Sequence, residues 1–281
     1  MGTSGAYGGA GGKAGRDVAA GADAWIDSLT GGDASGGAGV VSDGSTTSGG
    51  NSSEVIELPP QLVSGALAQL RPRVPSGGGG GGGGMSGAGG RVRESGASGG
   101  GRRSGGLRRS TTRAAGAAGR AGAAAYAYAT GDRAGLAALG LDFDSLRTLG
   151  DPIAVTTRIV EAACGPLGNG TLEDHEERYV AASVAEWVLE QAESGSPPAP
   201  EEIARHSIAA VVAEVLATEI TEALNQRPEE VAAVAEEELF EAAEVLASKV
   251  DLSVNGVTEA ELSKAIEEGI DTLKQIYGVS S

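Results

Sequence analysis

The chain has 281 residues, including 48 glycines, two tryptophans, five tyrosines and two phenylalanines, and its formal net charge is −17. Residues 1–120 hold 36 of the glycines and a net charge of +4, whereas residues 121–281 hold 12 glycines and a net charge of −21. The glycine-rich part cannot bury enough apolar surface to offset an ordering entropy of about 1–2 kcal/mol per residue, so we do not expect one globular domain of the full length.

The glycine-rich part contains two short amphipathic segments. In residues 17–30, apolar residues recur at intervals that place them on one face of a helix, namely Val18, Ala22, Trp25, Ile26 and Leu29. In residues 55–70 a similar spacing follows a pair of prolines, with Leu62, Ala66, Leu67 and Leu70 on one face. The rest of this part has the composition of a linker, most clearly in Gly77–Gly84. We therefore predict that residues 1–107 form a disordered arm carrying these two segments.

Residues 91–120 form an arginine-rich tract with eight arginines, one glutamate and no lysine. An alanine-rich helix is predicted to begin near Arg108 and to continue to about Tyr128. Its three glycines, Gly116, Gly119 and Gly122, lower the intrinsic helix propensity. We therefore expect this segment to be helical only where it packs against other elements.

The acidic part contains five well-marked helices. Their start signals are the N-cap Asp151 followed by proline, capping boxes at Thr171 and Thr258, and Pro228 followed by two glutamates. The proline-containing loop Ser194–Pro200 separates two of these helices. The β-branched residues recur at helical spacing, and no convincing strand is found. The sequence predicts an all-α fold, with residues 108–281 forming an acidic bundle of five to seven helices with short connections.

Motifs for catalysis and cofactor binding are absent from the sequence. The glycine-rich stretches lack the strand and the lysine spacing of phosphate-binding loops. We interpret His175 as part of a solvated first helical turn, His206 as a surface or core-edge residue, and Cys164 as a small packed residue at a helix C-terminus. The single cysteine excludes a disulfide scaffold. We accordingly expect a non-enzymatic protein without metal or other cofactor.

Neither a signal peptide nor a membrane span is predicted. The most apolar-looking tract, residues 114–129, is too short and too weakly apolar to cross a bilayer. A single unpaired cysteine suits a reducing compartment. The expected location is the cytoplasm, without membrane association.

Two interpretations of the arginine-rich tract remain open. Arginines in a Gly/Ser context can bind the nucleic-acid backbone, and the candidates are Arg102, Arg103, Arg108, Arg109 and Arg113. Against this, the tract lacks interleaved aromatic residues and the remainder of the chain is acidic. The tract can instead lie on its own acidic bundle or on a partner.

The two amphipathic segments also allow two interpretations. They resemble short segments that fold on entering a partner's groove. The residues that would bind a partner are Val18, Trp25, Ile26, Leu29, Leu62, Leu67 and Leu70. The alternative is that both segments pack locally on the helical bundle.

The chain begins with Met1 followed by Gly2, and a small second residue allows removal of the initiator methionine. The exposed glycine amine would have no side chain to hinder its attack. An α-amine has a pKa of about 7.7–8.0, so on the order of 10% is neutral and nucleophilic at pH 7. Gly2 is therefore a candidate acceptor for covalent modification.

Several segments together resemble the QatB family, components of the bacterial Qat anti-phage defence system. They are the MGTS start, the glycine-rich arm with Trp25, the tract Glu94–Ala123, the segment Leu149–Glu190 and the acidic helical tail. The likeness covers most of the chain outside residues 31–75.

The resemblance implies a set of partners and a modification. The partners would be an ATPase (QatA), a QueC-like enzyme (QatC) and a TatD-like nuclease (QatD). Relatives of QueC in defence systems are thought to attach a deazaguanine to a partner's N-terminal glycine, which in this sequence is Gly2. The resemblance thus implies a non-catalytic defence component whose helical domain docks the partner proteins.

Overall fold

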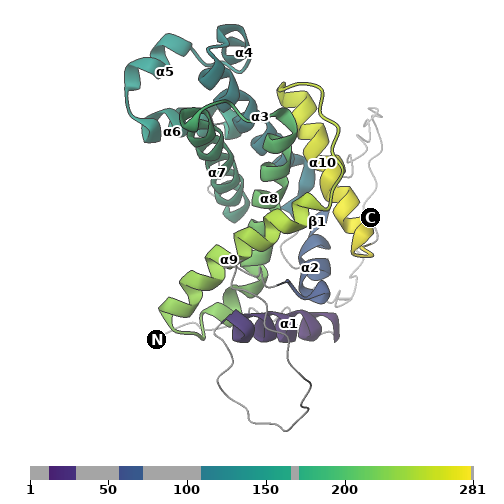
Figure 1. The fold of residues 1–281 in the computed structure, drawn as a ribbon. Helices are drawn as coiled ribbons and strands as arrows, with labels where there is room; N and C mark the ends of the chain where they lie inside the picture. Colours follow the sequence, from purple (N-terminus) through teal and green to yellow (C-terminus); the bar gives the residue numbers. More distant parts are fainter. Residues whose placement is uncertain (1–12, 30–56, 72–108, 166–170, 280–281) are drawn as a thin grey trace, which may run out of the picture.

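The computed structural model describes residues 13–29, 57–71, 109–165 and 171–279 (Figure 1). Within these ranges the chain forms ten helices and one pair of two-residue strands. The elements are α1 (Lys13–Leu29), α2 (Pro60–Leu67), β1 (Leu70–Arg71), β2 (Arg109–Ser110), α3 (Thr111–Thr130), α4 (Arg133–Ala138), α5 (Phe143–Leu149), α6 (Pro152–Cys164), α7 (Leu172–Ser194), α8 (Pro200–Leu224), α9 (Glu229–Ser248) and α10 (Glu259–Ile276). None of the described helices is both long and apolar enough to cross a membrane.

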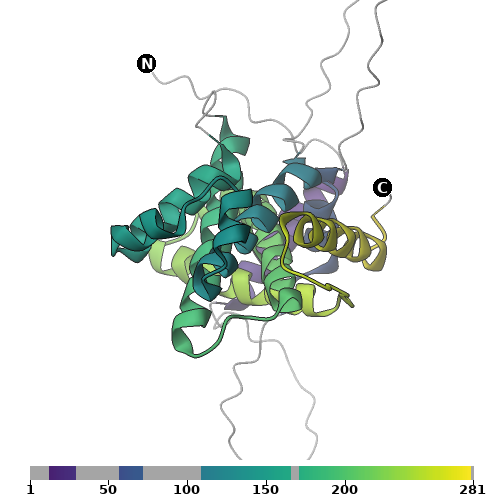
Figure 2. The same ribbon diagram turned by 90° about the horizontal axis from the view of Figure 1, so that it is seen from above.

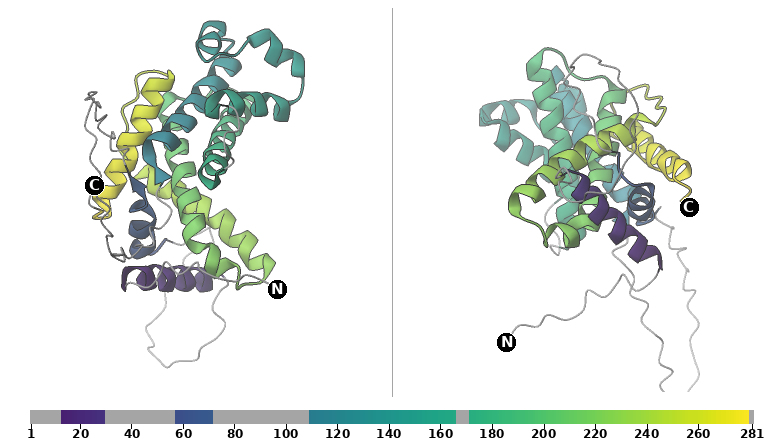
Figure 3. Two further views of the ribbon diagram at one scale, coloured as in Figure 1. Left: turned by 180° about the vertical axis from the view of Figure 1, so that it is seen from behind. Right: turned by 60° about the horizontal axis from the view of Figure 1, so that its bottom comes forward.

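The all-α fold class is confirmed, and α3 lies at its centre. This helix contacts α4, α6, α7, α8 and α10, while α8 pairs with α9. In the view from above, α10 lies on one side of the molecule and α4–α6 lie on the other (Figure 2). α1 lies at the end of the molecule opposite α4 and α5 (Figures 1 and 3). The buried apolar residues of these helices form one continuous core.

Small residues allow α3 to approach its neighbours closely. A Cβ added to Gly119 would lie 2.7 Å from the backbone nitrogen of Ser263 on α10. A Cβ added to Gly122 would lie 2.8 Å from a methyl carbon of Ile203 on α8. Two of the three glycines that weaken the isolated helix, Gly119 and Gly122, are therefore positions of close packing, as expected for a helix that forms on packing.

The predicted caps at Asp151, Thr171 and Thr258 form hydrogen bonds, whereas the helix that begins after Pro228 has no side-chain cap. The hydroxyl groups of Thr171 and Thr258 accept the backbone N–H groups of Asp174 and Glu261, and both capping boxes are complete. The carboxylate of Asp151 accepts the N–H of Ile153 ahead of α6. α3 begins at Thr111, three residues later than the predicted start near Arg108, because Ser110 is its N-cap.

Two short helices, α4 and α5, were not among the predicted elements. They have six and seven residues, which is too few for a visible apolar period. Asp132 and Asp142 cap them by accepting backbone N–H groups. An ion pair between Arg133 and Asp144, with nitrogen and oxygen 2.6 Å apart, joins the two helices. After residue 108 the described chain thus has eight helices.

The two amphipathic segments of the glycine-rich part are helical and belong to the packed body. α1 contacts α2, α8 and α9, and α2 also contacts α8 and α10. β1, just after α2, pairs in parallel with β2, just before α3, with Leu70 opposite Arg109. Strands this short have no alternating pattern to detect in a sequence. The boundary predicted at residue 107 therefore does not separate these segments from the helical domain, and the remainder of residues 1–107 lies outside the described ranges.

Substitution of glycine by alanine at two positions of α3 tests the close packing. Gly119→Ala should lower the free energy of unfolding by about 1–3 kcal/mol, because the new methyl group collides with the backbone of α10. Gly116→Ala is the matched control, since an added Cβ there meets nothing within 4 Å. It should raise stability by about 0.5–1 kcal/mol through helix propensity. Urea unfolding followed by circular dichroism measures both changes, and equal effects would contradict the packing role of Gly119.

Candidate functional site

The apolar face of α1 is buried in the body of the protein. Trp25 and Ile26 are 2% and 0% exposed, and Val18 and Leu29 pack against the core from its edge. On the facing segment, Leu62, Leu67 and Leu70 are also buried. Of the seven residues predicted to bind a partner, these five are buried by the chain's own helices, whereas Val18 and Leu29 are only partly buried. This agrees with the alternative interpretation, in which both segments pack locally on the helical bundle, because the apolar face of α1 packs against α2, α8 and α9.

The contact between α1 and α2 depends on a glycine. A Cβ added to Gly65 would lie 2.5 Å from a methyl carbon of Val18. The absence of a side chain at Gly65 therefore allows the first turns of α1 to lie directly against α2. We call Val18, Trp25, Ile26 and Leu62 the anchor of α1.

One arginine joins the outer face of α1 to the loop between α8 and α9. An Nη atom of Arg227 lies 2.8 Å from the carboxylate of Asp27, and the other lies 3.6 Å from Asp23. Both carboxylates are mostly exposed, so these pairs contribute at most about 1 kcal/mol. Burial of a large apolar side chain is worth more, about 1.5–3 kcal/mol. Trp25 and Ile26 therefore dominate the attachment of α1, and Arg227 fixes its orientation.

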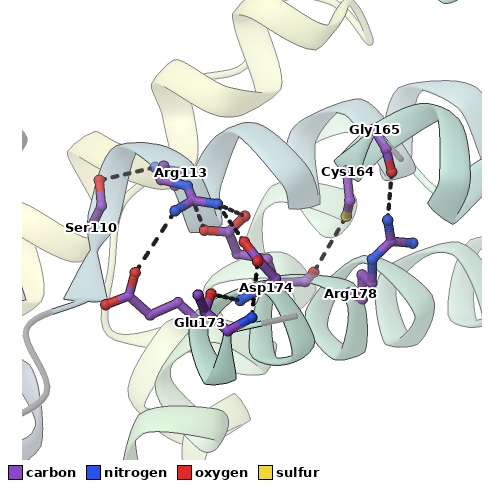
Figure 4. Close-up of polar contacts among 9 residues, drawn as sticks. Ser110, Arg113, Cys164, Gly165, Glu173, Asp174 and Arg178 are labelled. Carbon is purple, nitrogen blue, oxygen red and sulfur yellow. Dashed lines mark hydrogen bonds and ion pairs between the residues drawn. The ribbon is translucent and has the colours of Figure 1, made fainter. Parts of the chain in front are cut away.

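Two arginines of the arginine-rich tract, Arg113 and Arg120, bind acidic residues of this chain. Arg113 lies among the acids of the first turns of α7, 2.8 Å from Glu177, 3.0 Å from Asp174 and 3.7 Å from Glu173 (Figure 4). Partial burial acts against the charged form, but the hydrogen bond to Asp174 and the three nearby carboxylates raise the pKa of Arg113. The guanidinium of Arg113 therefore forms ion pairs within the protein itself.

Arg120 has a similar position two turns further along α3. Its Nε donates to Glu259 at 2.9 Å, and an Nη donates to the backbone carbonyl of Ala163 at 3.1 Å. The interpretation that the tract lies on its own acidic bundle is thus confirmed for Arg113 and Arg120. Arg102, Arg103 and Arg108 lie outside the described ranges. Arg109 lies in β2, where only its backbone is described.

Cys164 lies near Arg113 and its acidic partners on α7, and it is half-buried (Figure 4). Its thiol donates to the backbone carbonyl of Glu177, and Arg178 donates to the carbonyl of Gly165 beside it. Burial raises the pKa of the Cys164 thiol, which disfavours the nucleophilic thiolate. The prediction of a small packed residue is confirmed.

His206 differs from the prediction of a surface or core-edge residue, because it is only 7% exposed. Its ring stacks on Trp187 with ring centres 4.3 Å apart, and Phe240 lies 5.4 Å away at an angle of 56°. Neither ring nitrogen has a hydrogen-bond partner within the described chain. Burial lowers the pKa of His206 to about 4, so the imidazole is neutral at pH 7.

A cavity of about 230 Å³ opens beside this histidine. We call its lining the histidine pocket, which consists of Trp187, Glu202, Arg205, His206 and Glu244. The sequence carries a signal of this burial, since His206 follows Ile203 by three residues and precedes Ala210 by four. Both neighbours lie on the buried face of α8.

The described residues contain no group of three or more His, Cys, Asp or Glu side chains that could hold a metal ion. His175 is exposed in the first turn of α7, as predicted. Comparisons of the chain with protein-family models, with curated proteins and with solved structures give no match.

Replacement of Trp25 tests the anchor. Truncation of a buried tryptophan to alanine costs about 3–5 kcal/mol, and α1 lies at one end of the molecule. In the Trp25→Ala variant, α1 should therefore detach while the remaining helices stay folded. Thermolysin should then cleave within residues 17–29 much faster than in the wild type, as followed by mass spectrometry. Ala20→Ser, on the exposed face, should leave the rate unchanged, and equal rates for all three proteins would contradict the anchor.

The buried imidazole predicts a pH-dependent stability. As the pH falls below 6.5, the unfolded chain takes up a proton at His206, whereas the folded protein resists it until about pH 4. Stability should therefore fall from pH 6.5 to pH 4, by up to about 3 kcal/mol from this group. Urea unfolding across this range measures the slope. His206→Phe should reduce the slope and His175→Phe should keep it; the opposite result would contradict the burial of a neutral His206.

Proposed function

We propose that the protein is a non-enzymatic component of an anti-phage defence complex, related to QatB, that presents its N-terminus to a partner enzyme. Gly2, after removal of Met1, would be the acceptor for a deazaguanine attached by a QueC-like enzyme. The acidic helical body would dock the partners, which are a QatA-like ATPase, a QatC-like enzyme and a QatD-like nuclease. The catalytic groups of the complex would then belong to the partner proteins and not to this chain.

The anchored helix α1 is the observation that carries this proposal. Trp25 and Ile26 fix α1 to α2, α8 and α9. A fully extended chain spans at most 3.3–3.6 Å per residue, so Gly2 can lie no farther than about 40 Å from Lys13. A partner docked on the body can therefore hold its active site within reach of the terminal amine. The docking contacts raise the effective concentration of that amine.

A second candidate is nucleic-acid binding through the arginine-rich tract, and it has weaker support. Arg113 and Arg120 are engaged by acids of the chain itself. The body around them is acidic, which repels phosphate groups. Salt-dependent binding of DNA or RNA that is lost on changing Arg102, Arg103 and Arg108 would favour this candidate.

Intact mass spectrometry after co-expression with the QueC-like enzyme of the same system tests the proposal. The expected result is loss of Met1 and a mass increase equal to the deazaguanine group, which fragmentation places on Gly2. Gly2→Pro should abolish the increase, because a secondary ring amine replaces the unhindered primary amine.

Gly5→Pro is the matched control, since it introduces the same residue three positions along the chain without altering the amine. It should be modified like the wild type. An unmodified Gly2 amine in the presence of an active QueC-like enzyme would contradict the proposal.

A further inference from the structure

The histidine pocket lies where three helices meet and takes no part in the proposed function. Trp187 comes from α7, Glu202, Arg205 and His206 come from the first two turns of α8, and Glu244 comes from α9. The stacked ring of Trp187 and the nearby ring of Phe240 hold the imidazole in one orientation. The pocket therefore has a rigid aromatic wall and a rim of charged side chains.

Three polar atoms of this pocket are buried and lack hydrogen-bond partners within the described chain. They are both ring nitrogens of His206 and Nε of Arg205. Most buried polar atoms in proteins have a partner, so three exceptions on neighbouring residues of one cavity wall require an explanation. The cavity has room for a small molecule that would supply the missing hydrogen-bond partners.

The hydrogen-bonding chemistry of these atoms limits the bound molecule. A neutral imidazole has one N–H donor and one acceptor nitrogen. Nδ1 lies 3.5 Å from a carboxylate oxygen of Glu244, so a proton on Nδ1 is favoured and Nε2 is left as an acceptor. Nε of Arg205 is a donor only. With Nδ1 facing Glu244, the atoms left to be satisfied are Nε2 of His206 and Nε of Arg205. A single partner for these two atoms must donate one hydrogen bond and accept another.

The charges of the pocket limit it further. Glu202 and Glu244 disfavour an anion, and the guanidinium of Arg205 disfavours a cation. A neutral group with an adjacent donor and acceptor satisfies both conditions, and the carboxamide is such a group. A flat carboxamide also suits a wall made of stacked rings.

We propose that the histidine pocket binds a small neutral molecule through a carboxamide group. The amide N–H donates to Nε2 of His206, and the amide carbonyl accepts from Nε of Arg205. Both protein atoms are now covered, so entry requires side chains at the rim to turn aside. Glu244 can do so, because its side chain is 51% exposed.

Nitrogen NMR of the imidazoles tests this proposal on the full-length protein. The chain has two histidines, and the exposed His175 is an internal control. Titration with millimolar nicotinamide, a planar carboxamide, should shift the His206 nitrogen signals saturably and leave those of His175 unchanged. Benzoate, which has the same shape but carries a negative charge, should have no such effect.

Two variants complete the test. Arg205→Met should weaken nicotinamide binding about tenfold, since it removes a hydrogen bond to a charged donor. Arg158→Met, at an exposed arginine of α6, should bind like the wild type. The proposal is overturned if nicotinamide leaves His206 unshifted, if benzoate shifts it equally, or if Arg205→Met binds nicotinamide unchanged while its His206 signals show a folded protein.

Discussion

The close contact of α3 with its neighbours is the constraint on which the rest of the structure depends. This helix consists largely of alanine and glycine, and on its own such a sequence is a marginal helix. Its lack of bulk allows α7, α8 and α10 to approach it from different sides. At Gly119 the backbone of α10 occupies the space that a side chain would need. The core is therefore built around a thin central helix, and larger apolar residues are supplied by the surrounding helices.

The charge asymmetry of the sequence has a structural role within this arrangement. Arg113 connects α3 to the first turns of α7, and Arg120 connects it to Glu259 at the start of α10. Acids in a first helical turn are stabilised by the helix dipole, so these pairs form where acids are already favoured. Two arginines of the arginine-rich tract thus connect the central helix to its acidic neighbours.

The fold class and most long helices could be predicted because periodicity and caps are local signals, as at Asp151, Thr171 and Thr258. The short helices α4 and α5 could not, because six or seven residues show no period. The burial of Trp25 and Leu62 within this chain could not be predicted from local sequence patterns either. An apolar stripe shows that a helix has a partner, but not whether the partner belongs to the same chain. The histidine pocket was missed for a similar reason, since Trp187, His206 and Glu244 come together only through tertiary packing.

The packing of Trp25 and Ile26 makes α1 part of the acidic helical body. Native-state hydrogen exchange measures this most directly, residue by residue. We predict that the amides of Trp25 and Ile26 exchange far more slowly than in an unstructured chain, with protection similar to that of α2. Exchange of these amides at unstructured-chain rates, while α8 remains protected, would contradict the account.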